Sequence, residues 1–399
     1  MAAQYLQLSE SSLAIGLLTL LTGYVGADIA PDTIIERLLW PQRFSNGFNA
    51  GSIKNALFLS AGGPLHGTAI RAIDTFFKHG LQKGPGRGHL LGTALFPDTG
   101  ISYKMYPGNG KPVEEELVRN GLLVRILKCM SDTSALISRN EAAASMRQQI
   151  NVSHLEMFHF DNIPPQGAID LDAAEVNART IIALLASEMP TMILAIVISY
   201  LWNIPAGLLY LLPAFLKVLS AYTAVRREDL IIPHHKGSGQ WQATSEVSQF
   251  EVHIPGEGFQ VISGPSDLVL PFFRHYGHPI RCRWREITQM AIVAAMGVGY
   301  PVTFVITMIF MSLKVQMLWA GYQVMLLFTM LAARYGGGEL WGSTEERIAK
   351  ALLEAEKAGG GRIVVLKNNS GGLVGARLTR TLHGSYTEGK NQVAAIVSS

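Results

Sequence analysis

Residues 180–222 read TIIALLASEMPTMILAIVISYLWNIPAGLLYLLPAFLKVLSAY, and residues 287–333 read ITQMAIVAAMGVGYPVTFVITMIFMSLKVQMLWAGYQVMLLFTMLAA. The first segment contains two charged side chains, Glu188 and Lys217, and the second contains one, Lys314. As a single helix either segment would be roughly 65–70 Å long, whereas the hydrocarbon core of a bilayer is about 30 Å thick. Each segment is therefore too long for one crossing and has the length of two. They predict two transmembrane hairpins and a multi-pass membrane protein.

The overall composition agrees with this prediction and excludes several other classes of protein. Charged residues make up 16% of the chain, below the usual value of about 25%, because the two apolar segments contribute so few. The net charge of +3 is too small to indicate nucleic-acid binding, and the sequence has no long run of lysine and arginine. Two cysteines, Cys129 and Cys282, are too few for a disulfide framework. The lipid bilayer is the partner that the composition predicts.

The first apolar segment places its two charges symmetrically about a turn. Trp202-Asn203-Ile204-Pro205 has turn chemistry near the middle of the segment. Glu188 and Lys217 lie about fifteen residues to either side of it, so an antiparallel helix pair brings them to the same depth. A lone charge in hydrocarbon costs several kcal/mol, and a paired charge costs much less. We therefore predict an intramembrane pair; the alternative is that both side chains lie near the headgroups and never meet.

The second apolar segment divides at Lys314, which would lie at the connecting tip. On its first arm Ala291, Ala295 and Gly299 recur at four-residue spacing. Such a stripe of small residues lets another helix approach closely, so it predicts a helix-packing surface. Pro301 follows shortly afterwards and predicts a kink, because proline removes a backbone hydrogen bond.

On this pattern the chain divides into six segments. Residues 1–27 include a short apolar stretch and are predicted to be an N-terminal transmembrane helix; a cleaved signal peptide and a buried soluble helix are the alternatives. The remaining segments are a polar extramembrane region, the first hairpin, an arginine-flanked loop, the second hairpin and a C-terminal tail: residues 28–179, 180–222, 223–286, 287–333 and 334–399.

Local structure in the polar segments is less strongly indicated. Helical spacing of apolar residues predicts a helix over 113–150. Residues 250–261 alternate loosely, which suggests a small hairpin rather than a domain. In the tail, Ser343 and Glu346 form a capping box that opens a helix, and residues 362–378 then suggest two short strands with a turn.

These features together predict a mainly α fold class. It has two transmembrane hairpins and an N-terminal helix, a polar region of mixed helix and loop, and a small C-terminal helix with a β-hairpin. Five arginines flank the hairpins and assign the intervening loop to the cytosol under the positive-inside rule: Arg226, Arg227, Arg281, Arg283 and Arg285. With two hairpins, the three polar segments all face that side, although the acidic residues at 28–36 and the sequon at Asn151 favour the exterior.

Closely spaced histidines are the weak candidates for a metal site, since imidazole is a common metal ligand. His275 and His278 lie near Cys282, but arginines flank them and would repel a cation. His154 and His159, on either side of Glu156, are better explained as residues of a surface strand or helix. No catalytic residue, cofactor or metal site is predicted beyond these candidates.

Three classes of function remain open from the sequence. A non-enzymatic scaffold or accessory subunit, with protein partners or as a homo-oligomer, is the default because no catalytic motif is present. An oligomeric channel or transporter requires Glu188 and Lys217 to line a polar cavity. A membrane-embedded enzyme requires the histidines at 154–159 and 275–278 to converge from different loops.

Overall fold

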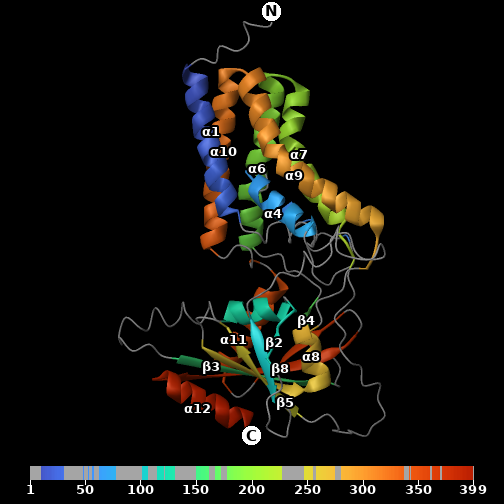
Figure 1. The fold of residues 1–399 in the computed structure, drawn as a ribbon, viewed down its shortest axis with the longest axis vertical. Helices are drawn as coiled ribbons and strands as arrows, with labels where there is room; N and C mark the ends of the chain where they lie inside the picture. Colours follow the sequence, from blue (N-terminus) through green and yellow to red (C-terminus); the bar gives the residue numbers. More distant parts are fainter. Residues whose placement is uncertain are drawn as a thin grey trace, which may run out of the picture.

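A bundle of helices lies at one end of the protein and a β-sheet lies at the other in a computed structural model (Figure 1). The structure describes residues 10–30, 48, 53, 56–57, 63–77, 101–106, 115–120, 122–130, 150–160, 167–171, 178–226, 247–254, 258–274, 280–336, 341, 343–359, 362–368 and 371–398.

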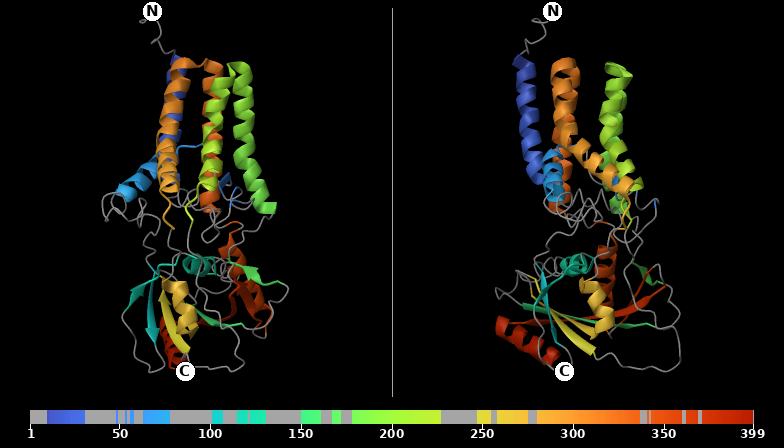
Figure 2. Two further views of the ribbon diagram at one scale, coloured as in Figure 1. Left: turned by 90° about the vertical axis from the view of Figure 1, so that its right-hand side faces the viewer. Right: turned by 45° about the vertical axis from the view of Figure 1, so that its right-hand side comes forward.

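Five long helices make up most of the bundle, and all five are long and apolar enough to cross a membrane. They are α1 (Glu10–Ile29), α6 (Ala178–Leu201), α7 (Ile204–Tyr222), α9 (Arg283–Phe310) and α10 (Leu313–Tyr335). The turns of the two helix hairpins and the first turn of α1 lie at the end of the bundle away from the sheet (Figure 2). The two apolar segments of the sequence thus form the two hairpins α6–α7 and α9–α10.

The turn between α6 and α7 follows from its local sequence. Asn203 caps α7 by accepting a hydrogen bond from the Ala206 amide at 2.8 Å, and Pro205 occupies the first turn, where its missing N–H is harmless. At Gly207 the two helices come so close that a Cβ atom would overlap the Ala195 carbonyl oxygen and the Ser199 hydroxyl of α6. Glycine is therefore required for this approach.

Helix α1 packs along α10 at the side of the bundle (Figure 1). The Tyr300 hydroxyl donates to the Thr19 carbonyl at 2.7 Å, which connects α1 to α9 as well. Leu17, Leu20 and Leu21 remain exposed on its other side. This pattern disagrees with the alternative of a buried soluble helix and fits a lipid-facing one.

Part of the polar segment 28–179, which is predicted to be extramembrane, packs against the helix bundle. Helix α4 (His66–Phe76) packs against α9 through Ala69, which is fully buried. A Cβ at Gly297 would lie 3.4 Å from the Ala69 methyl. Close packing on α9 therefore occurs at Gly297. The helix bends near its middle (Figure 2), where Gly297 and Pro301 both weaken it.

The three polar segments together form one eight-stranded sheet in the order β2-β1-β5-β6-β3-β8-β7-β4. Segment 28–179 contributes four strands, β1 (Ser102–Tyr106), β2 (Glu116–Leu117), β3 (Ile150–His159) and β4 (Ile169–Asp170). The loop contributes β5 (Val247–His253) and β6 (Phe259–Pro265), and the tail contributes β7 (Val364–Lys367) and β8 (Leu373–His383). Strand β3 joins all three, because it pairs in parallel with β6 and antiparallel with β8.

This sheet corrects the predicted fold class. The chain is mostly helical, but the polar segments are not separate accessory elements. The β5–β6 hairpin forms as predicted, yet it lies inside the sheet instead of standing alone. The predicted helix over 113–150 is wrong in part, since residues 116–117 form β2 and only 122–130 are described as helical before β3 begins at Ile150. Apolar spacing was misleading there because Glu116 and Leu117 pair with β1 at the edge of the sheet, and this tertiary pairing overrides the local pattern.

Helices cover the two faces of the sheet unequally. One face is covered by the helix at 122–130, by α8 (Ser266–Arg274) and by α11 (Thr344–Lys357), and Phe250, Phe272 and Leu352 lie in this main core. Ser343 caps α11 as the sequence predicts, accepting from the Glu346 amide at 3.1 Å. The other face packs against α12 (Tyr386–Val397) at one end through a small cluster around Val393. Beyond that cluster this second face carries polar side chains.

Candidate functional site

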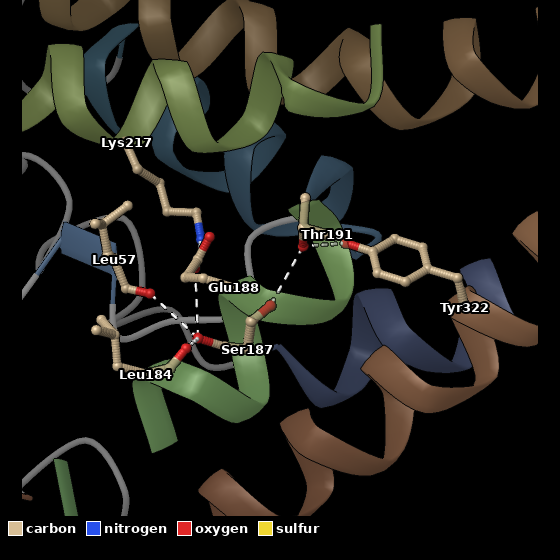
Figure 3. Close-up of polar contacts among 7 residues, drawn as sticks. All are labelled: Leu57, Leu184, Ser187, Glu188, Thr191, Lys217 and Tyr322. Carbon is tan, nitrogen blue, oxygen red and sulfur yellow. Dashed lines mark hydrogen bonds and ion pairs between the residues drawn. The ribbon is translucent and has the colours of Figure 1, made fainter. Parts of the chain in front are cut away.

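The two charged side chains of the first hairpin meet inside the helix bundle (Figure 3). The Lys217 ammonium donates to Glu188 Oε1, and the lysine side chain is only 2% exposed. Each residue lies thirteen positions from the turn, counted from Leu201 to Glu188 on α6 and from Ile204 to Lys217 on α7. That spacing is about 20 Å along each helix. The equal count in two antiparallel helices brings the two charges together.

Hydroxyl groups connect this ion pair to a neighbouring helix. Ser187 Oγ lies 3.4 Å from Glu188 Oε1 and also reaches the carbonyl oxygens of Leu57 and Leu184. One turn later, Thr191 Oγ1 donates to the Ser187 carbonyl at 3.2 Å and lies 2.6 Å from the Tyr322 hydroxyl of α10 (Figure 3). The polar network therefore fixes the positions of α6, α7 and α10 relative to one another.

A cavity of about 40 Å³ lies in the same bundle and is lined by α7, α9 and α10 and by Gly63 and Leu65, which precede α4. Its walls are mostly apolar and aromatic, and they include Tyr322 and Gln323 of α10. Neither Glu188 nor Lys217 lines it. The requirement of the channel hypothesis, that these two charges face a polar cavity, is thus not met by this cavity.

A second buried polar link joins α7 to α9 at the sheet-side end of the bundle. Gln289 is 0% exposed; its amide nitrogen donates to the Ser220 carbonyl at 2.9 Å and to Thr223 Oγ1 at 3.1 Å. Its carbonyl oxygen accepts from Ser220 Oγ at 3.1 Å. Both polar atoms of this amide are therefore paired with α7 or with its C-cap residue, Thr223.

Of the five arginines, four lie within the described residues and one, Arg227, lies outside them. Arg283 pairs with Glu286 at 2.9 Å. Arg285 donates to the Ala224 carbonyl at 2.5 Å and covers the Trp284 ring at 4.9 Å. The other two, Arg226 and Arg281, lie in the short described stretches that lead into and out of the bundle. The described arginines lie at the end of the bundle that faces the sheet.

The histidines at 154 and 159 do not converge. Both lie on β3, but five positions separate them, so they point to opposite faces of the sheet. His159 Nε2 lies 3.6 Å from Asp267 of α8 on the core side. His275 and His278 lie outside the described residues. Among the residues that the structure describes, no group of three or more histidine, cysteine, aspartate or glutamate side chains could hold a metal ion.

His154 contacts a serine on the opposite, polar face, and this pair was not anticipated from the sequence. His154 Nε2 lies 2.5 Å from Ser263 Oγ of β6, and that hydroxyl donates to Gln249 Oε1 of β5. Because a serine has a single proton to donate, His154 must supply the proton of the His154–Ser263 hydrogen bond. The contact joins the side chains of β3 and β6 on this face.

Similar contacts extend this pair into a row across five strands, which we call the polar row: Tyr106, Glu251, Gln249, Ser263, His154, Glu156 and Arg377. The Tyr106 hydroxyl donates to Glu251 at 2.9 Å, and Arg377 pairs with Glu156 at 3.3 Å. Burial, followed by the hydrogen bond to Glu251, raises the pKa of Tyr106 to about 12. The row links β1, β5, β6, β3 and β8 through side chains.

Burial also lowers the pKa of His154, against a smaller opposing effect of the Glu156 carboxylate. The folded protein therefore binds this proton less readily than the unfolded chain, whose histidines titrate near 6.5, and stability is lost as the pH falls below about 6.5. We expect the unfolding temperature of the detergent-solubilised protein to fall between about pH 7 and pH 5, and His154→Gln to reduce that slope. An unchanged slope in His154→Gln would contradict the assignment.

Comparison of the chain with models of protein families, with curated proteins and with solved structures finds no match.

Proposed function

We propose that this chain is an integral multi-pass membrane protein that serves as a non-enzymatic scaffold or accessory subunit. In this proposal the five apolar helices anchor the protein, and the sheet presents its polar face to a protein partner. The polar row is the observation that carries the proposal.

The organisation of the chain supports an anchoring role for the bundle. Strands before α6, between α7 and α9, and after α10 belong to a single sheet. The two hairpins return the chain to the same end each time, so the sheet assembles on one side of the membrane. Arg179, at the start of α6, pairs with Glu346 of α11 at 3.5 Å and lies 5.1 Å over the Trp341 ring. These contacts connect the start of α6 to α11, which covers the sheet.

The polar row supports a binding role for the sheet. Its side chains form three groups of contacts across neighbouring strands, Tyr106 with Glu251, Gln249 with Ser263 and His154, and Glu156 with Arg377. Each contact restricts the rotamers of its partners. A preorganised surface loses less conformational entropy when a partner binds. Two positions on this face are exposed and suitable for substitution: Thr379, directly opposite His154, and Lys104, directly opposite Glu251. A partner with complementary polar and charged groups would contact them.

The proposal is tested by the size of the native complex that contains this protein. We expect wild-type protein, extracted from its own membrane in mild detergent, to migrate on a native gel as a complex larger than the 43.4 kDa chain. Thr379→Arg adds a long charged side chain to the polar face and should release the partner, which leaves a smaller species. Co-purification of two differently tagged copies separates a homo-oligomer from a complex with another protein.

The matched control is Lys350→Glu. Lys350 is also exposed, but it lies on α11, which covers the opposite face of the sheet. We expect this variant to migrate as wild type. The proposal fails if wild-type protein migrates as a single chain, or if Thr379→Arg leaves the complex unchanged while the variant remains folded.

A further inference from the structure

Helices α7 and α9 touch at both ends and separate in between. At the sheet side, Gln289 binds Ser220 and Thr223 as described above. At the far end, the Tyr210 hydroxyl lies 2.8 Å from Thr307 Oγ1. Between these two contacts α9 bends, and the cavity of about 40 Å³ opens at this level. The bend in one helix and two fixed contacts therefore create a space along the α7–α9 interface.

The small residues of α9 line that space. Ala295 and Gly299 belong to the cavity wall, whereas the exposed Ala291 does not. A Cβ atom at Gly299 would meet no atom within 4 Å. The stripe was predicted to let a neighbouring helix approach closely, but at Gly299 it leaves room instead. Pro213 of α7 lies on the other side of the space.

The inner wall is rigid and aromatic. Trp319 of α10 is 1% exposed, and its ring centroid lies 5.8 Å from that of Tyr300. On the outer side the lining includes Leu212, which is 37% exposed on the apolar surface of the bundle, and the half-buried Thr303. Gly299 is sixteen residues from the start of α9 and eleven from its end, at Arg283 and Phe310. The opening therefore lies at mid-height on a surface that faces lipid in a membrane-spanning bundle.

The chemistry of the lining identifies the kind of ligand. The three tyrosine hydroxyls around the cavity are already hydrogen-bonded, Tyr210 to Thr307, Tyr322 to Thr191 and Tyr300 to the Thr19 carbonyl. A buried water needs two to four polar partners. Besides these three hydroxyls the lining has the Thr303 hydroxyl and the Gln323 amide as polar groups, and its other side chains are apolar or aromatic. Apolar atoms gain dispersion contacts in such a space, and a volume of about 40 Å³ admits a few methylene groups.

We propose that this cavity is a lateral binding site for a segment of a lipid acyl chain, inserted between α7 and α9 from the surrounding bilayer. The inference rests on the proposed membrane integration. The chain would pack against Trp319 and over Gly299 and so complete the contact between the two helices. Ala295 and Gly299 are then specificity-determining, because any larger side chain would occupy the position of the acyl chain.

The test uses the full-length protein in phosphatidylcholine vesicles that contain a phosphatidylcholine with a photoactivatable diazirine in one acyl chain. After irradiation, residue-level mass spectrometry compares labelling of three cavity-lining residues of α7, Leu209, Pro213 and Leu216, here called the cavity segment, with labelling of the exposed Ile182 and Leu185 on α6. In wild type the cavity segment should be labelled strongly. Gly299→Leu should reduce its labelling by roughly fivefold or more, because the leucine fills the space, and labelling on α6 should not change.

Ala291→Leu is the matched control, because it adds the same side chain to the same stripe of small residues but outside the cavity. Its cavity segment should be labelled as strongly as that of the wild type. If Gly299→Leu does not fold, Gly299→Ala is used instead. It should reduce labelling of the cavity segment by a smaller factor, and its methyl group meets no atom within 4 Å. Unchanged labelling of the cavity segment in a folded Gly299 variant overturns the lipid site. Release of the wild-type protein from membranes by alkaline carbonate overturns the membrane proposal instead, so the two failures are distinguishable.

Discussion

Lys217→Met is expected to lower the free energy of unfolding of the helix bundle by about 3–5 kcal/mol, the range found when one partner of a buried ion pair is removed. The lysine side chain is 2% exposed and its ammonium contacts Glu188. The substitution leaves the buried carboxyl group of Glu188 without its cation, while the Ser187 hydroxyl stays 3.4 Å from it. Unfolding in mixed detergent micelles, followed by circular dichroism, measures the change.

The double variant Glu188→Gln with Lys217→Met distinguishes loss of the ion pair from a general loss of stability that each substitution would cause by itself. It removes both charges, and replacing a buried ion pair by neutral groups is often close to neutral in stability. We therefore expect the double variant to be more stable than Lys217→Met alone. Lys314→Met is the matched control, because Lys314 is exposed at the tip of the second hairpin, and it should have little effect. If the changes in the free energy of unfolding caused by the two single substitutions add strictly in the double variant, Glu188 and Lys217 do not form a pair.

Gly207→Leu is the second substitution with a large expected effect. A side chain at this position would overlap the Ala195 carbonyl oxygen, which belongs to the backbone of α6 and cannot rotate away. The two helices must then move apart, which also pulls Lys217 away from Glu188. We expect a loss of about 3 kcal/mol in the free energy of unfolding, at the upper end of typical overpacking costs. The same unfolding measurement in mixed micelles reports it.

Gly321→Ala provides the comparison. Gly321 lies inside α10, where a Cβ atom would meet nothing within 4 Å. The alanine should leave stability unchanged or raise it by up to about 1 kcal/mol, because alanine favours the helix more than glycine does. If Gly207→Leu proves as stable as Gly321→Ala, then close packing at Gly207 does not hold the first hairpin together.

Much of the bundle could be predicted from local properties of the chain. Length and hydropathy predict four of the helices, and Asn203 with Pro205 predicts the turn of the first hairpin. The equal distance of Glu188 and Lys217 from that turn predicts their depth. Helix α4 and its packing on the bundle were not predicted. A short helix of mixed polarity has the same sequence pattern in an extramembrane loop as at the edge of a helix bundle.

The sheet and its polar row could not be predicted in the same way. The contact between His154 and Ser263 depends on the parallel pairing of β3 with β6, whose residues are more than a hundred positions apart. A one-residue change of register would turn either side chain to the other face. The alternation of polar and apolar side chains along β3 shows that the strand has one polar and one apolar face. This pattern does not identify the strands that pair with β3.

By itself, the sequence determined that two long apolar segments turn back on themselves and that one hairpin holds two charges at equal depth. Hydrophobicity, helix rise and turn chemistry act over a few residues, so these features can be read locally. Only the tertiary structure decided that three polar segments close into one sheet, that His154 and His159 face opposite ways, and that Gly299 lines a cavity instead of a helix contact. Each of these depends on which distant segments pair and where a helix bends, and those are properties of the packed chain as a whole.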